Sequence, residues 1–180
     1  MLHVTIPAIE FFDNSKNEFI EFKEQRLQLE HSLVSLAKWE SKWKKPFLGK
    51  DPKTAEETID YIRCMTITQN VDPEVYQRIP NSCIEEIKNY IDDSMTATWF
   101  SEKNRPKNSS KVITAEIVYY WMIALNIPFE CQKWHLNRLL TLIRVCDIEN
   151  SPKKKMGKRD LASRNRSLNA ARKKRLGTHG

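Results

Sequence analysis

Glycine is scarce in this sequence, which has four glycines among 180 residues. Only Gly49 lies within the first 151 residues. Loops that cradle phosphate groups need clustered glycines, because their backbone approaches the phosphate closely or takes a positive φ. The scarcity therefore excludes a P-loop, a dinucleotide-binding fingerprint and the G-x-S-x-G turn that carries a hydrolase nucleophile.

The sequence also lacks closely spaced cysteine pairs and long apolar runs. The four cysteines form no C-x-x-C motif, so we expect reduced thiols and a fold without disulfides. The longest apolar run, residues 117–125, has nine residues, whereas a helix that spans a bilayer needs about 20. The first residues include Pro7 and Glu10 and lack the pattern of a signal peptide. We therefore expect a cytoplasmic protein with no membrane contact.

Acidic residues are nearly absent from the C-terminal end. Residues 152–180 hold eleven Lys/Arg and one Asp, a net charge of +10, while residues 1–151 hold nineteen Lys/Arg and twenty-two Asp/Glu, a net charge of −3. Because residues 152–180 contain little apolar material, we expect a flexible basic tail that is disordered when free. Residues 159–175 are expected to become helical on a partner. The candidate partner-binding cations are Lys153, Lys154, Lys155, Arg172, Lys173, Lys174 and Arg175.

The basic tail is open to two interpretations. In the first, its cations neutralise the phosphates of nucleic acid. It has no aromatic side chain to stack on a base, so this contact would be weak and independent of sequence. In the second, the tail is a tether that becomes ordered on an acidic or helical protein partner.

Two periodicities predict an α+β, mainly α, body over residues 1–151. Apolar and polar residues alternate over residues 1–31, which predicts a short antiparallel β meander of two or three strands. Apolar residues then recur at helical spacing, which predicts about five helices. They form a helical middle over residues 32–100 and, after a polar loop, a helical hairpin over residues 112–150.

Capping residues place the expected helices. Ser32 can cap a helix that runs to about residue 44, and Asp72-Pro73 is a typical helix start. Thr54 and Ser82 each begin a capping-box pattern.

The expected C-terminal hairpin has two helices. Residues 115–125 are apolar nearly all round, which predicts a central buried helix. Pro128 separates it from a helix over roughly residues 130–149. The apolar stripe of this second helix contains Leu136, Leu139, Leu140, Ile143 and Cys146.

No group of residues predicts catalysis. Cys131 and His135 are spaced to share a helix face, but two ligands fall short of a zinc site. The simpler interpretation is a buried thiol beside a half-exposed imidazole. No set of Asp, Glu and His residues has metal-site spacing, so we expect no catalytic residue, no metal and no cofactor.

An aromatic segment rich in lysine offers a candidate surface. Trp39 and Trp43 lie one helical turn apart among four lysines, and Phe47 follows them. One interpretation is that the rings anchor the core while lysine stems cover their edges. The other is a partner-binding surface, because tryptophan is enriched at binding hot spots. Trp39, Trp43 and Phe47 are therefore candidate partner-binding residues.

Five segments resemble tail assembly chaperones of long-tailed bacteriophages. They are HSLVSLAKWESKWKKPF (31–47), ETIDYIRCMTI (57–67), MTATWFSE (95–102), VITAEIVYYWMIALNIPFECQKWHLNRLLTLI (112–143) and the basic ending RNRSLNAARKKRLGTHG (164–180). The resemblance implies a small, non-enzymatic, largely helical protein that acts in the host cell cytoplasm. Such chaperones bind the tape measure protein, keep it soluble, and help the tail tube protein polymerise around it.

The resemblance carries over no binding residue, because no residue-level motif marks that role. Self-association of the chain is compatible with the resemblance. Two other functions remain open: a basic-tailed phage protein that binds nucleic acid, and a minor structural component of the virion.

Overall fold

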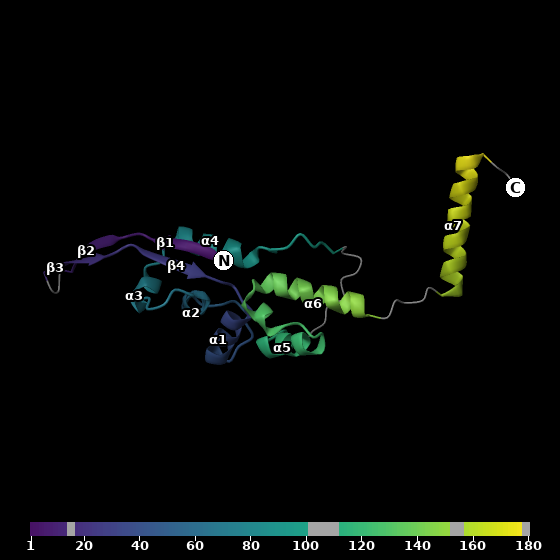
Figure 1. Cartoon of the computed structure of the whole chain (residues 1–180). Coiled ribbons are helices and arrows are strands. Elements are labelled where there is room, and N and C mark those ends of the chain that lie inside the picture. Colours follow the sequence, from purple (N-terminus) through teal and green to yellow (C-terminus); the bar gives the residue numbers. More distant parts are fainter. Residues whose placement is uncertain (14–16, 101–111, 152–156, 178–180) are drawn as a thin grey trace. The chain divides into compact units, whose positions relative to one another are not determined.

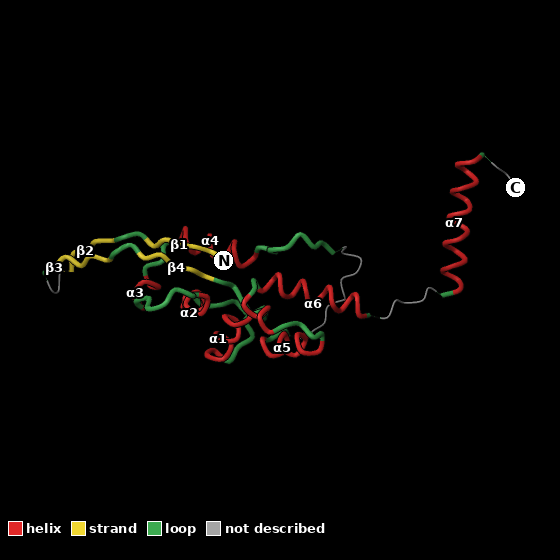
Figure 2. The backbone as a smooth tube through the Cα atoms, viewed as in Figure 1, coloured by secondary structure: helices red, strands yellow, loops and turns green. Residues whose placement is uncertain are grey.

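The computed structural model describes residues 1–13, 17–100, 112–151 and 157–177. These residues form an α+β fold that is mainly helical (Figures 1 and 2), which confirms the predicted fold class. The contacts divide the chain into a unit over Met1–Asp147 and a unit over Ile148–Gly180.

Four strands form the N-terminal part of the first unit. β1 pairs antiparallel with β4, and β2 pairs antiparallel with β3. The two ladders continue in the same register, so the strands form the two arms of one long antiparallel hairpin, within the two or three strands expected. Its interruption coincides with Pro7, which has no N–H to donate to a ladder. The strands are β1 (Leu2–Ile6), β2 (Ile9–Asp13), β3 (Glu18–Phe22) and β4 (Gln25–Leu29).

The described residues after the strands contain seven α-helices and a 3-10 helix, joined by loops. They are α1 (Leu33–Trp43), α2 (Ala55–Met65), α3 (Pro73–Gln77), α4 (Asn81–Asp92), α5 (Ala115–Ala124), η2 (Phe129–Lys133), α6 (Leu136–Asn150) and α7 (Lys158–Leu176).

Three of the four predicted helix starts are confirmed. The side chains of Ser32, Thr54 and Asp72 cap α1, α2 and α3. The prediction for Ser82 is wrong, because the N-cap of α4 lies two residues earlier, at Pro80, and makes no side-chain cap bond. Pro80 starts this helix instead: its ring holds φ at −63°, and its carbonyl accepts the first helical hydrogen bond, at 3.1 Å.

The C-terminal helices differ from the expectation in two respects. α5 is not buried all round: Tyr120 and Ile123 are exposed, and its buried residues lie on one stripe. The second helix starts at Leu136, later than expected, because its N–H is bonded to the carbonyl of His31 at 2.7 Å. Residues Phe129–Lys133 form the 3-10 helix η2. The apolar stripe of α6 is confirmed, with Leu136, Leu139 and Ile143 buried.

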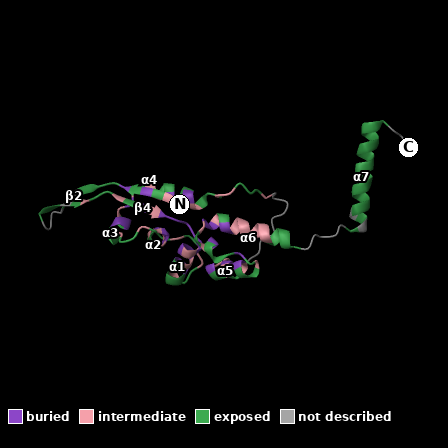
Figure 3. Cartoon of the chain, in the orientation of Figure 1, coloured by how far each residue is buried: buried purple, intermediate pink, exposed green. Residues whose placement is uncertain are grey.

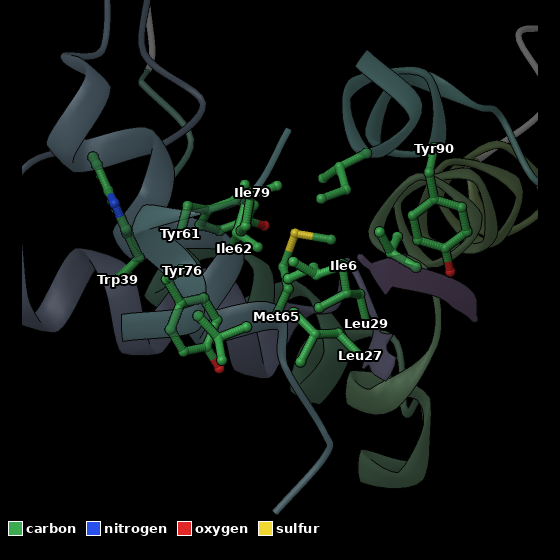
Figure 4. Close-up of a cluster of buried hydrophobic side chains, with 13 residues drawn as sticks. Ile6, Leu27, Leu29, Trp39, Tyr61, Ile62, Met65, Tyr76, Ile79 and Tyr90 are labelled. Carbon is green, nitrogen blue, oxygen red and sulfur yellow. The ribbon is translucent and has the colours of Figure 1, made fainter. Parts of the chain in front are cut away.

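Two clusters of buried side chains form the core of the first unit. The first joins the hairpin β1–β4 to α2, α3 and α4, and Figure 4 shows its labelled residues. The second joins α5, η2 and α6. Helix α1 contributes to both, because Trp39 belongs to the first and Leu33 and Leu36 belong to the second. The burial pattern along each element is visible in Figure 3.

A buried carboxylate connects segments that are distant in the sequence. Glu40 on α1 accepts hydrogen bonds from the backbone N–H groups of Phe47 and Ala115, each at 2.8 Å. Ala115 is the first residue of α5, and Thr114 before it makes no side-chain cap bond. Glu40 thus caps α5 from a position 75 residues earlier in the chain.

The second unit contains the helix α7, where disorder was expected. The sequence Lys158–Leu176 has no proline or glycine and consists largely of good helix formers. Gly177 ends the helix in the left-handed conformation, with φ of 64°. Every described side chain of α7 is exposed, so this helix is supported by local propensity and not by burial. The candidate residues Lys153, Lys154 and Lys155 lie outside the described residues.

Deleting residues 152–180 should leave the melting temperature of the remaining chain within about 2 °C of the full-length value. Residues 157–177, the described portion of the deleted part, contribute no side chain to either core cluster, so we expect little loss of buried apolar contact. Differential scanning calorimetry of both proteins tests this. A fall of about 5 °C or more would mean that α7 packs on the body.

Candidate functional site

The two candidate tryptophans on α1 have different environments. Their rings are stacked, with centroids 6.1 Å apart. Trp39 is fully buried, and its Nε1 donates to the carbonyl of Glu57 at 2.9 Å. Trp43 is half-buried, and its Nε1 donates to Oδ2 of Asp60 at 2.8 Å. The structure therefore favours the core-anchoring interpretation for Trp39, while Trp43 keeps some surface for a partner.

Two of the four lysines around these rings, Lys42 and Lys45, are paired with carboxylates of α2. Lys45 donates to Oε1 of Glu57 at 2.6 Å, and Lys42 bonds Asp60. The hydrogen bond from Lys45 lowers the pKa of the Glu57 carboxyl. Burial acts to raise the pKa of Asp60, but the hydrogen bonds from Lys42 and Trp43 lower it. These two ion pairs fasten α1 and the residues just after it to α2, so Lys42 and Lys45 are not free to form a basic surface.

Phe47, the third aromatic candidate, lines an open apolar cavity between α2 and α4. Its ring stacks on Tyr61, with centroids 3.8 Å apart and planes inclined by 23°. The cavity has a volume of about 170 Å³ and an almost wholly apolar lining, to which Ile84 and Ile91 also contribute. We call this cavity the α2–α4 groove.

Two lysine side chains lie beside the α2–α4 groove. Nζ of Lys53 lies 4.6 Å from the centroid of the Phe47 ring. Lys88 on α4 lines the groove and is exposed. An apolar cavity that can hold a large side chain, with lysines beside it, suits an amphipathic segment with an apolar anchor and acidic neighbours.

A buried pair of histidines lies where the two core clusters meet. The rings of His31 and His135 are 5.1 Å apart between centroids. Nδ1 of His31 lies 2.6 Å from the hydroxyl of Tyr61. Nε2 of His135 lies 2.9 Å from the carbonyl of Tyr90, whose hydroxyl donates to Oε1 of Glu30 at 2.7 Å. This network connects the chain just after β4 to α2, to α4 and to the residue just before α6.

The electrostatics of the pair favour neutral imidazoles. Burial and the neighbouring His135 lower the pKa of His31 to about 3. Burial also lowers the pKa of His135, although its hydrogen bond to the Tyr90 carbonyl acts in the opposite direction. Nδ1 of His135 has no hydrogen-bond partner among the described residues. Both rings are buried, which suits a structural role better than proton transfer to a substrate.

The pairing of Cys131 with His135 on one helix face is not observed. Cys131 lies in η2, while His135 precedes the first residue of α6. The expected half-exposed imidazole is in fact buried, as is the Cys131 side chain. Across residues 1–13, 17–100, 112–151 and 157–177, no group of three or more His, Cys, Asp or Glu residues is arranged to hold a metal ion.

The second basic cluster of the tail lies on α7. Arg172, Lys173, Lys174 and Arg175 occupy its last turns, and all four side chains are exposed. Basic residues at a helix C-terminus interact favourably with the helix dipole. The structure therefore presents these four candidates to solvent.

Comparisons with known proteins give no further assignment: no family model, no curated protein and no solved structure matches the chain. Among the described helices, none has the length and apolar character needed to cross a bilayer.

The α2–α4 groove and the histidine pair did not emerge from the sequence. The shared helical spacing of Ile84, Ile87 and Ile91 indicates an apolar face on α4, but it does not show that part of this face stays open. His31 and His135 are 104 positions apart, and no sequence pattern links one to the other. Only the tertiary fold brings these residues together.

Proposed function

We propose that this chain is a non-enzymatic chaperone of phage tail assembly that binds the tape measure protein and assists assembly of the tail tube. Five segments of the sequence support the proposal through their resemblance to such chaperones. The structural observation that carries it is the α2–α4 groove, an open apolar cavity in a mainly helical body.

The groove fits what such a partner would need. A tape measure protein is expected to be a long helical chain whose apolar faces aggregate when uncovered. A groove between two helices can bind one apolar side chain of an amphipathic helix and shield the face around it. Lys53 and Lys88 would favour acidic residues beside the anchor. Weak contacts of this kind also allow release when tube subunits take over.

Co-expression with the tape measure protein tests the proposal. We expect the wild-type chain to increase the soluble fraction of the tape measure protein. Thr58→Trp should remove this effect, because Thr58 lines the groove and a tryptophan would fill it. Thr98→Trp is the matched control, since it adds the same ring at an exposed loop position.

The outcomes separate two claims. If the wild-type chain leaves tape measure solubility unchanged, the chaperone proposal fails. If Thr58→Trp supports solubility as well as the wild-type chain does, the groove is not the binding site. A transient chaperone should also be missing from purified virions, so its stoichiometric detection there by mass spectrometry would favour a structural component.

One observation favours a second candidate function, nucleic-acid binding. α7 carries eight Lys/Arg and one Asp over 19 residues, and its described side chains are all exposed. Such a helix can neutralise phosphates without reading a base sequence. A gel-shift titration with unrelated DNA and RNA, at about 50 mM and about 200 mM salt, tests this. Retardation at low salt that disappears on deletion of residues 152–180 would place nucleic-acid binding first.

A further inference from the structure

One face of the β2–β3 hairpin combines exposed aromatic rings with facing carboxylates. Phe12 lies opposite Phe19, and Glu10 lies opposite Glu21. Because side chains alternate along a strand, these four residues share one face. The two phenyl rings are in edge contact, with centroids 4.9 Å apart, and are 42% and 70% exposed. We call Glu10, Phe12, Phe19 and Glu21 the hairpin face.

The hairpin face is unfavourable in isolation. Like charges directly opposite on paired strands destabilise the pairing. Within the described parts of the chain, neither Glu10 nor Glu21 has an ion-pair partner. Two phenyl rings on a two-stranded ladder are also left largely in water. A ligand that relieves both effects needs apolar groups that contact the phenylalanines and cations that contact the glutamates. The glutamates lie two residues farther along the strands, which is about 6.6 Å away.

α7 carries these two features at a matching spacing. Leu161 and Leu168 are seven residues apart, which places them on one side of the helix, and each is about half exposed. Arg172 follows Leu168 by four residues and Arg175 by seven, so both arginines project from the same side. The rise from Leu168 is about 6 Å to Arg172, which matches the glutamate level, and about 10.5 Å to Arg175. We call Leu161, Leu168, Arg172 and Arg175 the leucine–arginine face.

We propose that the hairpin face of one copy of this chain binds the leucine–arginine face of α7 from a second copy. Leu168 packs on the rings of Phe12 and Phe19, while the two arginines neutralise the facing glutamates. The exposed charges on the two faces have opposite sign, and each copy carries both faces. The contact is therefore heterologous: it joins copies head to tail and can close into a ring or extend. This inference does not depend on what the α2–α4 groove binds.

Sedimentation velocity of the full-length chain, freed of nucleic acid, tests the inference. Association should increase with protein concentration at about 50 mM salt and weaken strongly at about 500 mM salt, because exposed charge pairs are screened. The variant Glu10→Lys/Glu21→Lys and the variant Arg172→Glu/Arg175→Glu should each weaken self-association by about tenfold or more. Phe12→Ser/Phe19→Ser should weaken it without changing the charge.

Mixing the two charge-reversal variants tests whether the hairpin face and the leucine–arginine face bind each other. The two charge-reversal variants should associate with each other when mixed, because each then offers the complement of the other. The matched control is Glu85→Lys/Glu86→Lys on α4, which reverses two exposed carboxylates elsewhere and should leave association unchanged. Circular dichroism verifies that each variant is folded.

Three results would overturn the inference. The first is a chain that stays monomeric at every concentration in low salt. This result is also expected if α7 binds the hairpin of its own chain. The second is unchanged association of folded Glu10→Lys/Glu21→Lys. The third is a mixture of the two reversed variants that stays monomeric.

Discussion

Acidification from about pH 7 to about pH 5 should lower the free energy of unfolding steeply, because His31 and His135 are buried as neutral imidazoles. Burial lowers the pKa of His31 to about 3 in the folded chain, whereas an unfolded histidine has a pKa of about 6.5. Below that value the unfolded chain binds protons that the folded chain does not. Each such histidine therefore removes about 1.4 kcal/mol per pH unit over the interval between its two pKa values.

Urea denaturation at several pH values measures this slope. His31→Gln should flatten it between about pH 6.5 and about pH 5, because one buried titrating group is lost. His3→Gln replaces an exposed histidine and should leave the slope unchanged. Glu57 and Asp60, whose pKa values are lowered in the fold, lose their contribution only below their ordinary pKa values of 4.5 and 3.8. Equal slopes for wild type and His31→Gln would contradict the burial argument.

Replacing Trp39 with alanine should reduce the free energy of unfolding by about 3–5 kcal/mol. The indole is 1% exposed and contacts the rings of Trp43, Phe47 and Tyr61. Its loss leaves a cavity where α1 packs on α2, and it leaves the Glu57 carbonyl without its donor. Losses of this size are a large fraction of the stability of an ordinary domain.

Chemical denaturation followed by circular dichroism measures the effect. Trp99→Ala is the matched control, because that ring is 81% exposed and its loss should cost about 0.5 kcal/mol or less. Trp39→Phe keeps most of the apolar contact but not the hydrogen bond, so it should fall between the two. Equal destabilisation by Trp39→Ala and Trp99→Ala would show that Trp39 is not a core residue.

The sequence predicts elements best where the chemistry is local. Ser32, Thr54 and Asp72 cap helices through backbone groups two or three residues away, so a short pattern contains the whole interaction. The alternation of Val4, Ile6, Leu27 and Leu29 likewise predicts strands with one buried face, and all four side chains are buried.

The sequence does not predict features that depend on contacts between residues distant in the sequence. The apolar character of α5 suggests burial on all sides, but the described fold covers only the stripe of Ala115, Val118 and Met122. α6 begins late because the β-bridge between Ser32 and His135 holds the short stretch between η2 and α6 extended. The same is true of the candidate site. Trp39, Trp43 and Phe47 are aromatic residues of one lysine-rich segment, and only the fold shows which of them belongs to the core and which reaches the surface.

The cap that Glu40 provides for α5 affects the order in which the protein folds. During synthesis α1 is complete long before Ala115 exists, so its Leu33 and Leu36 must wait for partners that are made much later. When α5 arrives, docking on α1 and capping of its first turn occur in the same step. Loop closure of this length is slow compared with local helix formation. Once α5 has docked, α1 is a member of both core clusters, so the two clusters should melt together as one cooperative unit.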